Sequence, residues 1–484
     1  MSAQKKSPVQ DSLCSSGTTG RRDFVRGATF AAIGLVASAN RLWPRALHSR
    51  GLAGPPVSPS QTAGIPEPDY RIEIAQIEWE ISPRKRIRTS AYGGQIPGQL
   101  IRVSEGKPVS IEIVNRLDHP EIVHWHGQWV PVEVDGSAEE GSPMIPPGGR
   151  TRITFAPRPT GLHWYHTHAM ANHGLKHGLY TGQFGMLLVD PITDPGRYDQ
   201  ECFVVLHDWE PYYSPSDDGS LMVHYVSGSI NGRQLGHDSP IQVRQGQRVL
   251  FHILNASATD AHWLAFPGHQ FQVLTLDGFR VATEAKVETL RLGPAERVTA
   301  VVTMDRPGVW VLGEARTGIR NAGMGTVVEY AGRTGSPQFG PPPPLAWDYR
   351  AFGDLTPSIH KPDTIIPLVF TPRFKGHGAT DQWMINGKSF PESDPITLKE
   401  GLRHRLVFDN RSSDDHPVHL HRHNFELVSI RGRALSGVHK DVVVVEANSR
   451  VEVDLLATNP GNTLFHCHQQ DHMDAGFMAL FRYA

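Results

Sequence analysis

One internal repeat constrains the fold of this chain more than any other feature of its sequence. Three glycines each precede an asparagine by nine residues, with starts 140 and 155 residues apart. The three pairs are Gly106 with Asn115, Gly246 with Asn255, and Gly401 with Asn410. Each unit contains a turn-forming glycine, a strand-like run such as 109–114, and the asparagine that ends it. The repeat therefore predicts three tandem β domains.

Length and composition agree with that prediction. At roughly 150 residues per domain, a chain of 484 residues is expected to form about three domains. The 47 glycines, 38 prolines and scarce helical periodicity favour an all-β chain that is rich in turns. The 47 basic and 49 acidic residues leave no charge excess that would indicate nucleic acid or anionic lipid as a partner.

The domain boundaries follow from breaks in the strand-like pattern. Domain 1 is predicted at 67–195, ending where strand-like residues give way to Asp190-Pro191 and a polar turn. Domain 2 is predicted at 196–340 and ends in the proline-rich segment 336–346, which is typical of a stiff connector. Domain 3 is predicted at 341–484.

Residues 1–39 have the pattern of an export signal rather than of a domain. Arg21-Arg22 and the four residues after them are similar to a twin-arginine motif, and an apolar run of small residues follows. That run of 13 residues is shorter than the ~20 needed to cross a bilayer, so no transmembrane segment is predicted. We expect cleavage after Ala39, a linker at 40–66, and a periplasmic or extracellular protein. Of the cysteines beyond the signal, Cys202 is expected to be a buried thiol.

Four histidine-rich clusters carry the chemistry. They are His124-Trp125-His126, the segment from His163 to His168, the segment from His416 to His423, and His466-Cys467-His468 with His472 four residues later. The repeat places these clusters: histidines stand nine and eleven residues after the asparagine in the first and third units. In the second unit the same positions are Leu264 and Phe266. Domains 1 and 3 are therefore predicted to share one site, with domain 2 as a spacer.

The tripeptide His466-Cys467-His468 is predicted to connect two sites. In an extended strand, His466 and His468 face one side and Cys467 faces the other. A thiolate with imidazoles suits a blue-copper centre, and imidazoles alone suit further copper ions. One short covalent path would then join two metal sites, which is an arrangement for electron transfer.

Together, the four clusters resemble the copper-binding signatures of the multicopper oxidases, in the three-domain, laccase-like form. The resemblance covers the chain from about Tyr70 to its end. It implies three tandem cupredoxin-like domains, each a Greek-key β-sandwich, with one type 1, one type 2 and two type 3 copper ions. The implied type 2 ligands are His124 and His419. The implied type 3 ligands are His126, His166, His168, His421, His466 and His468, and the implied type 1 ligands are His416, Cys467 and His472.

The same resemblance implies an oxidase that couples one-electron oxidation of a reducing substrate, expected to be phenolic or aromatic, to reduction of O2 to water. One alternative is a metal oxidase acting on Cu(I) or Fe(II) in metal tolerance. A second alternative is a non-enzymatic cupredoxin scaffold of the cell envelope, which the complete ligand set disfavours. We expect a monomer whose partners are O2, a small reductant and the twin-arginine export machinery.

Asp135 matches the acid that the family places near its oxygen-reducing site, although an Asp-Gly turn explains the same residue. A second family acid is replaced here by Met473, with Asp471 and Asp474 as candidate substitutes. The axial position of the type 1 site falls on Phe477. Strand alternation argues that its neighbour Met478 points to the opposite face.

Overall fold

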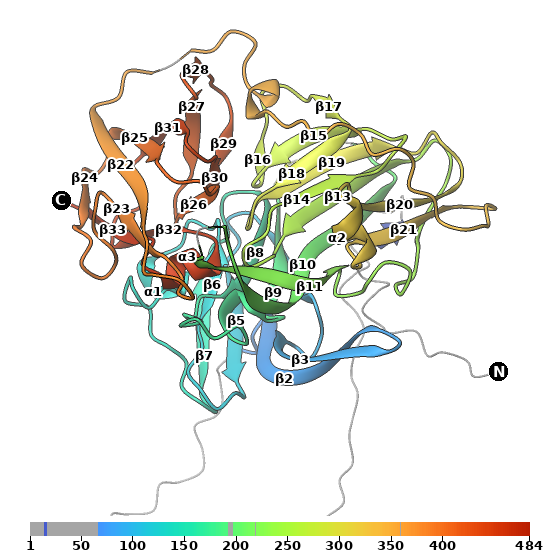
Figure 1. The fold of residues 1–484 in the computed structure, drawn as a ribbon, viewed down its shortest axis with the longest axis horizontal. Coiled ribbons are helices and arrows are strands. Elements are labelled where there is room, and N and C mark those ends of the chain that lie inside the picture. The colour runs from blue at the N-terminus through green and yellow to red at the C-terminus, as the bar shows by residue number, and fades with distance from the viewer. Residues whose placement is uncertain (1–13, 17–65, 192–196, 218, 359) are drawn as a thin grey trace, which may run out of the picture. The chain divides into compact units, whose positions relative to one another are not determined.

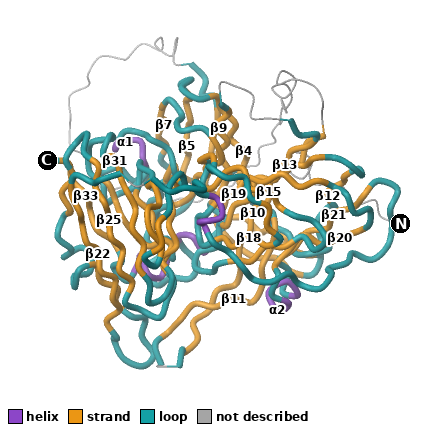
Figure 2. The backbone as a smooth tube through the Cα atoms, turned by 90° about the horizontal axis from the view of Figure 1, so that it is seen from above, coloured by secondary structure: helices purple, strands orange, loops and turns teal. Residues whose placement is uncertain are grey.

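The structure is a computed structural model that describes residues 14–16, 66–191, 197–217, 219–358 and 360–484. Most of these residues lie in strands and loops, and the helices are short (Figure 2). They are α1 (Val132–Asp135), η2 (Gly178–Tyr180), α2 (Thr317–Asn321), η3 (Tyr349–Phe352) and α3 (Gln470–Asp474). None of the helices in these ranges is long and apolar enough to span a membrane. The predicted export signal and linker lie outside the described residues except for 14–16 and residue 66.

Two four-stranded sheets form the first part of the fold, with strand orders β3-β2-β5-β7 and β4-β9-β8-β6. Ile72, Ile74, Ile111 and Ile113 alternate inward from neighbouring strands and pack with Trp125 and Tyr165 from the other sheet. This is the interior of a β-sandwich. Its strands are β2 (Tyr70–Ser82), β3 (Lys85–Tyr92), β4 (Gly98–Ser104), β5 (Val109–Asn115), β6 (Val123–His126), β7 (Arg150–Phe155), β8 (Gly161–Thr167) and β9 (Phe184–Asp190).

The middle part again pairs two sheets, one of eight strands built on β10-β13-β19-β15 and one of five in the order β12-β21-β20-β14-β18. Its strands are β10 (Gln200–Pro215), β11 (Leu221–Ile230), β12 (Ile241–Val243), β13 (Arg248–Asn255), β14 (His262–Ala265), β15 (Phe271–Leu276), β16 (Phe279–Arg280), β17 (Lys286–Val287), β18 (Thr289–Leu292), β19 (Arg297–Thr303), β20 (Val309–Glu314) and β21 (Gly325–Tyr330). The short strand β1 (Cys14–Ser16) pairs with β10 and sets position 14 opposite Cys202. Cys202 is disulfide-bonded, so the expectation of a buried thiol there was wrong.

The last part has a seven-stranded sheet built on β23-β22-β25-β31-β27-β28 and a five-stranded sheet in the order β24-β33-β32-β26-β30. Its strands are β22 (Thr364–Arg373), β23 (Gln382–Ile385), β24 (Ile396–Leu398), β25 (Arg403–Asn410), β26 (His416–Leu420), β27 (Phe425–Ile430), β28 (Arg433–Ala434), β29 (His439–Lys440), β30 (Val442–Val445), β31 (Arg450–Leu456), β32 (Thr463–Cys467) and β33 (Met478–Tyr483). Figure 1 shows the three parts in blue to cyan, green to yellow, and orange to red. The fold is all-β, as predicted, with a sandwich repeated three times.

The repeat has a clear physical basis. The three repeat glycines have φ values of +69°, +83° and +78°, a left-handed conformation that glycine adopts without a Cβ clash. Each repeat asparagine ends its strand and donates its side-chain amide to carbonyl groups of the loops that follow. Asn115 reaches His119 O at 2.8 Å, Asn255 reaches Asp260 O at 2.8 Å, and Asn410 reaches Asp414 O at 2.7 Å. The asparagine therefore fixes the loop that leads into the next strand, which carries the histidines in the first and last parts.

Candidate metal centre

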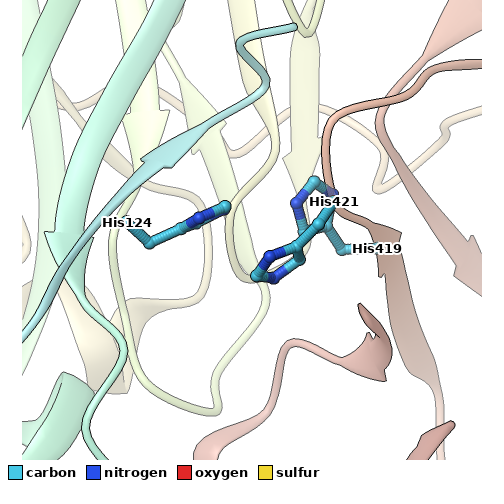
Figure 3. Close-up of side chains that lie close together, drawn as sticks. All are labelled: His124, His419 and His421. Carbon is cyan, nitrogen blue, oxygen red and sulfur yellow. The ribbon is translucent and has the colours of Figure 1, made fainter. Parts of the chain in front are cut away.

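Eight predicted histidine ligands lie together in a buried set, which we call the histidine site. Its members are His124, His126, His166, His168, His419, His421, His466 and His468. Strand pairing brings them together, because β6 pairs with β8 and β26 pairs with β32. Along β6, His124 and His126 share one face while Trp125 points into the core of the first sandwich. Figure 3 shows the ring of His124 facing those of His419 and His421 from the last part of the chain.

His124 and His419 have matching environments. Nδ1 of His124 donates to the carbonyl oxygen of Asp135 at 2.8 Å, and Nδ1 of His419 donates to that of Asp441 at 2.7 Å. These bonds fix the tautomer and leave each Nε2 as a lone-pair donor. Both Nε2 atoms are buried and have no hydrogen-bond partner among the described residues. Two free imidazole nitrogens that face one site suit a metal ion.

The remaining six histidines divide into two groups of three. His168, His421 and His466 form one group, with nitrogen atoms all within 4.8 Å of one another. The rings of His126, His166 and His468 form the other, with centroid distances of 5.1 to 5.5 Å. Neither ring nitrogen of His168 or His468 has a hydrogen-bond partner in the described ranges. The sequence predicted the six ligands without this division.

Within each group, two nitrogen lone pairs face each other. Nδ1 of His421 donates to Asp135 Oδ2 at 2.7 Å, and Nδ1 of His466 donates to the Cys467 carbonyl at 2.9 Å. Their Nε2 atoms are therefore both unprotonated, and they lie 3.1 Å apart. The other group repeats this pattern, with His126 Nδ1 and His166 Nε2 separated by 3.4 Å. Such pairs repel unless a cation binds them, so the donor atoms fit copper ions.

Burial keeps several of these histidines neutral. Desolvation lowers the pKa of His168 to about 3, and it lowers the pKa values of His126, His166, His419 and His421 well below the usual range. The neighbouring imidazoles act in the same direction. Neutral imidazole is the form that binds a metal, so no proton competes for these nitrogens near neutral pH.

The second donor set is the cysteine site, formed by His416, Cys467 and His472. The Cys467 sulfur lies 3.8 Å from His416 Nδ1 and 3.7 Å from His472 Nδ1, and the two nitrogens are 3.2 Å apart. A trigonal ion with metal–N of ~2.05 Å and metal–S of ~2.3 Å gives S–N edges of ~3.8 Å and an N–N edge of ~3.6 Å. The geometry therefore fits one ion in the His2Cys arrangement of blue-copper proteins.

Phe477 closes the cysteine site from one side. It is fully buried, its ring centroid lies 4.8 Å from that of His416, and its carbonyl accepts the backbone N–H of Cys467. Met478 instead packs with Leu464 and Met473 in a separate apolar cluster. The two side chains point to opposite faces, as strand alternation requires.

Asp135 lies at the histidine site rather than in a simple turn. It ends helix α1, and Gly136 follows with a φ of +82°, so tightly packed that a Cβ would lie 1.8 Å from the Val123 carbonyl oxygen. The Asp135 carboxylate is buried and lies 3.3 Å from His124 Nδ1 in addition to its bond with His421. The glycine therefore allows the backbone geometry that turns the acid inward.

The sequence interpretation missed Glu140. This buried residue accepts the backbone N–H of Leu464 at 2.5 Å, and one carboxylate oxygen lies 3.4 Å from His421 Nδ1. Burial and the neighbouring Asp135 raise its pKa well above the usual range, against the opposing effect of Arg422. Its place five residues after Asp135 is a local signal, but that spacing does not distinguish Glu140 from a surface acid. On the cysteine side, Asp474 accepts Gln470 Nε2 at 3.0 Å and the Ala171 N–H at 3.2 Å.

The sequence interpretation also missed a contribution from the middle part of the chain. Arg297, the first residue of β19, forms a buried ion pair with Asp441, whose carboxylate lies 3.2 Å from His126 Nε2. The middle sandwich was expected to be a spacer, and it has no histidine in the site. It nonetheless reaches the site through an arginine.

The middle sandwich also keeps an altered copy of the cysteine site. Ser412 lies two residues after its repeat asparagine and places Oγ 2.9 Å from His416 Nε2. Ser257 lies two residues after its own repeat asparagine and places Oγ 3.0 Å from His262 Nε2. His262 therefore occupies the position of His416.

A carboxylate stands where the thiol would be. Glu314 follows Gly308 by six residues, as Cys467 follows Gly461. Glu314 Oε2 lies 3.1 Å from His262 Nδ1, and Asp208 Oδ2 lies 2.8 Å from His262 Nε2. The two carboxylates outweigh burial and raise the pKa of His262 to about 10. A protonated imidazole therefore holds this position.

Comparison with known proteins follows the same division of the chain. Three family models, each described as multicopper oxidase, match residues 73–194, 201–328 and 366–484. The multicopper oxidase MmcO of Mycobacterium tuberculosis is 31% identical over 439 residues, which cover 82% of this chain and 83% of that protein. Laccase-1 of Fomitopsis schrenkii is 26% identical, and the matched region covers 86% of this chain and 87% of that protein.

Solved structures show the same similarity. A multi-copper oxidase from Pseudomonas thermotolerans is 26% identical with a TM-score of 0.67, covering 86% of this chain and 98% of its own. The laccase from Botrytis aclada has a TM-score of 0.73 at 17% identity, covers 85% of this chain and 87% of its own, and supports the fold alone.

Proposed function

Because the chain belongs to the multicopper oxidase family, we propose that its two donor sets hold four copper ions in a type 1 site and a trinuclear site. The protein is a copper-dependent oxidase that uses O2 and a reducing substrate. In this proposal the cysteine site is type 1. His124 and His419 hold the type 2 ion, and the two groups of three histidines hold the type 3 pair. When bound, these ions supply the redox chemistry of substrate oxidation and O2 reduction.

One observation carries the proposal. Cys467 belongs to the cysteine site, while His466 and His468 on either side belong to different groups of the histidine site. The backbone of three residues is thus the shortest covalent connection between the sites. His466 strengthens it, because its Nδ1 donates to the carbonyl of Cys467 itself. The chain therefore fixes both the distance and the orientation between the two donor sets.

Asp135 is the proposed acid of the oxygen-reducing site. Its carboxylate is buried, it touches ligands of the type 2 and type 3 groups, and its Oδ1 has no hydrogen-bond partner in the described part of the chain. An acid at that place can deliver protons to the reduction of O2, which consumes them. The Asp471 and Asp474 carboxylates remain candidates for a second donor, since Met473 cannot supply one.

The proposed substrate is a small phenolic or aromatic reductant. A phenyl ring at the axial position withholds the thioether that would stabilise oxidised copper, so a relatively high potential is expected. The metal-oxidase alternative has an observation of its own. Asp414 opposes the lowering effect of burial on the pKa of His472, and Asp381, Asp415 and Asp471 lie around Asp414. Carboxylates beside His472 would attract Fe(II) or Cu(I).

The test is a comparison of steady-state turnover on a phenol panel, Fe(II) and Cu(I), after copper content has been measured on the purified protein. The proposal expects about four copper ions per chain, an intense blue thiolate band and O2 uptake without released peroxide. A zinc-only protein or stoichiometric peroxide would contradict it. Preference for the metal ions, lost on replacement of Asp414 with Asn, would select the alternative.

We propose domain boundaries at 67–195, 196–340 and 341–484, consistent with sheets whose strands lie within these ranges apart from the short β1. Export by the twin-arginine pathway to the periplasm or outside the cell is supported by the Arg21-Arg22 motif and the apolar run after it.

A monomer is proposed because all predicted ligands come from one chain.

A further inference from the structure

We propose that Arg297 and Asp441 form a positioning pair for the trinuclear site, through which the middle sandwich sets the orientation of His126. The inference rests on the proposed function, since it assigns His126 to the type 3 pair. It gives the middle domain, which contributes no histidine to the histidine site, a role in the chemistry of a site built from the other two.

Asp441 acts on two ligands at once. Its side-chain Oδ1 lies 3.2 Å from His126 Nε2, and its backbone carbonyl accepts Nδ1–H of His419 at 2.7 Å. A carboxylate can only accept, so His126 carries its proton on Nε2 and presents Nδ1 to the site. His419 is fixed in the opposite tautomer and presents Nε2. Asp441 thus determines which ring nitrogen faces the site in two ligands, His126 from the first domain and His419 from the third.

Arg297 fixes the Asp441 carboxylate from the middle domain. Its two terminal nitrogens each contact one carboxylate oxygen at 2.5 Å, a bidentate arrangement. The other N–H groups donate to the carbonyl oxygens of Leu162 at 3.2 Å, Ala295 at 3.2 Å and Asp277 at 3.0 Å. All five donors are used, and the side chain is fully buried. The guanidinium therefore has one available position, and so does the carboxylate.

Gly127 shows that the chain makes room for this pair. It follows His126 directly with a φ of +83°. A Cβ there would lie 2.4 Å from Asp441 Oδ2 and 2.8 Å from an Arg297 terminal nitrogen. Only glycine lets the ion pair approach the backbone beside the ligand.

Loss of the Arg297–Asp441 pair should affect the histidine site and leave the cysteine site unchanged. Groups that hydrogen-bond to a ligating histidine orient the ring, and their loss costs ~10–100-fold in metal affinity or activity. Loss of Arg297 would leave the Asp441 carboxylate buried without its bidentate partner and free to change rotamer. The His126 ring would then lose its fixed tautomer, while the cysteine site, which contacts neither residue, would be unchanged.

The test compares Arg297→Met and Arg297→Lys with wild type as copper-loaded enzyme. The readouts are copper per chain, the paramagnetic resonance of the type 2 ion, the absorption of the type 3 pair and the blue band. Separate rapid-mixing experiments measure reduction of the blue centre without O2 and reoxidation by O2. For Arg297→Met we expect altered type 2 and type 3 spectra and reoxidation slowed ~10–100-fold, with anaerobic reduction within about twofold of wild type. Arg297→Lys should recover part of the loss.

Arg405→Met is the matched control, because Arg405 pairs bidentately with Asp454 at 2.8 and 3.1 Å away from both donor sets. It should lose stability without any spectral change. Should Arg297→Met not fold, Asp441→Asn decides, since it keeps the shape and removes the charge. Wild-type spectra and reoxidation in the variant that folds would overturn the inference. Absence of type 2 and type 3 signals from the wild type would instead overturn the proposed function.

Discussion

Asp135 Oδ2 accepts a hydrogen bond from Nδ1 of His421 at 2.7 Å, although the two residues are 286 positions apart. The bond joins the first sandwich to the last and holds His421 with Nε2 facing Nε2 of His466. The same carboxylate lies 3.3 Å from His124 Nδ1. Asp135 therefore combines two roles: it orients ligands, and it is the proposed proton donor.

Replacing Asp135 with Asn separates these roles. The amide oxygen can still accept from His421, but the side chain no longer delivers a proton. We expect O2-dependent reoxidation to slow by at least ~100-fold, in the range for loss of a general acid. Anaerobic reduction of the blue centre should stay near wild type. Stopped-flow measurement of both half-reactions provides the check, and equal slowing of the two would favour a purely structural role in the turn.

Replacing Cys467 with Ser should abolish the blue colour and substrate oxidation. The histidine site should keep its copper, because His466 is oriented by the backbone carbonyl of residue 467, which the substitution retains. Metal analysis should therefore show a loss of about one ion per chain, with type 2 and type 3 signals present. Persistent oxidation of substrate would show that electrons enter elsewhere.

The axial position can be tested by two substitutions with opposite expectations. Phe477→Met introduces a thioether beside the cysteine site and should lower its reduction potential. Met478→Leu alters only the apolar cluster with Leu464 and should leave the potential almost unchanged. Redox titration of the blue band measures both, and the reverse order of effects would identify Met478 as the ligand.

His262 makes stability depend on pH in the middle domain. Its folded-state pKa of about 10 lies above the ~6.5 expected for the unfolded chain, so the folded protein binds this proton more tightly. The stabilisation is complete below pH ~6.5 and is lost as pH rises through about 10. His262→Gln should therefore lower the free energy of unfolding by ~3 kcal/mol at pH 6, as for a broken buried ion pair.

Urea unfolding of both proteins at several pH values measures this difference. It should shrink steadily above pH ~7 and be smallest above pH 10. A difference that does not change with pH would mean that His262 is neutral in the folded protein. His269→Gln serves as a control in the same domain, because burial lowers the pKa of His269 to about 4 and it stays neutral at these pH values.

Much of this molecule could be predicted from short-range sequence regularities. The repeat glycine and asparagine each have a local geometric role, so their spacing indicated three β domains and the positions of the predicted ligands. Period-two alternation indicated that Cys467 faces away from His466 and His468. The family resemblance placed Phe477 at the axial position, and alternation indicated that Met478 points to the opposite face. In each of these cases the information lies within a few residues.

Glu140, Arg297 and Asp441 could not be found in that way. Their significance arises from contacts between domains: Arg297 and Asp441 are 144 positions apart, and Asp441 lies 315 positions from His126. No local spacing in the sequence relates these residues to the groups that they contact. In the sequence alone, each resembles an ordinary charged residue of the surface. The division of six histidines into two groups could not be predicted for the same reason. Each group contains histidines from both outer domains.

The protonated His262 also affects whether the middle domain can bind a metal ion. An imidazole held between two buried carboxylates is a donor set that would otherwise suit zinc or copper. Any such ion must first displace a proton held with a pKa of about 10, which at pH 7 reduces its apparent affinity by ~10³. The proton bound at His262 therefore disfavours metal binding at this position of the middle domain.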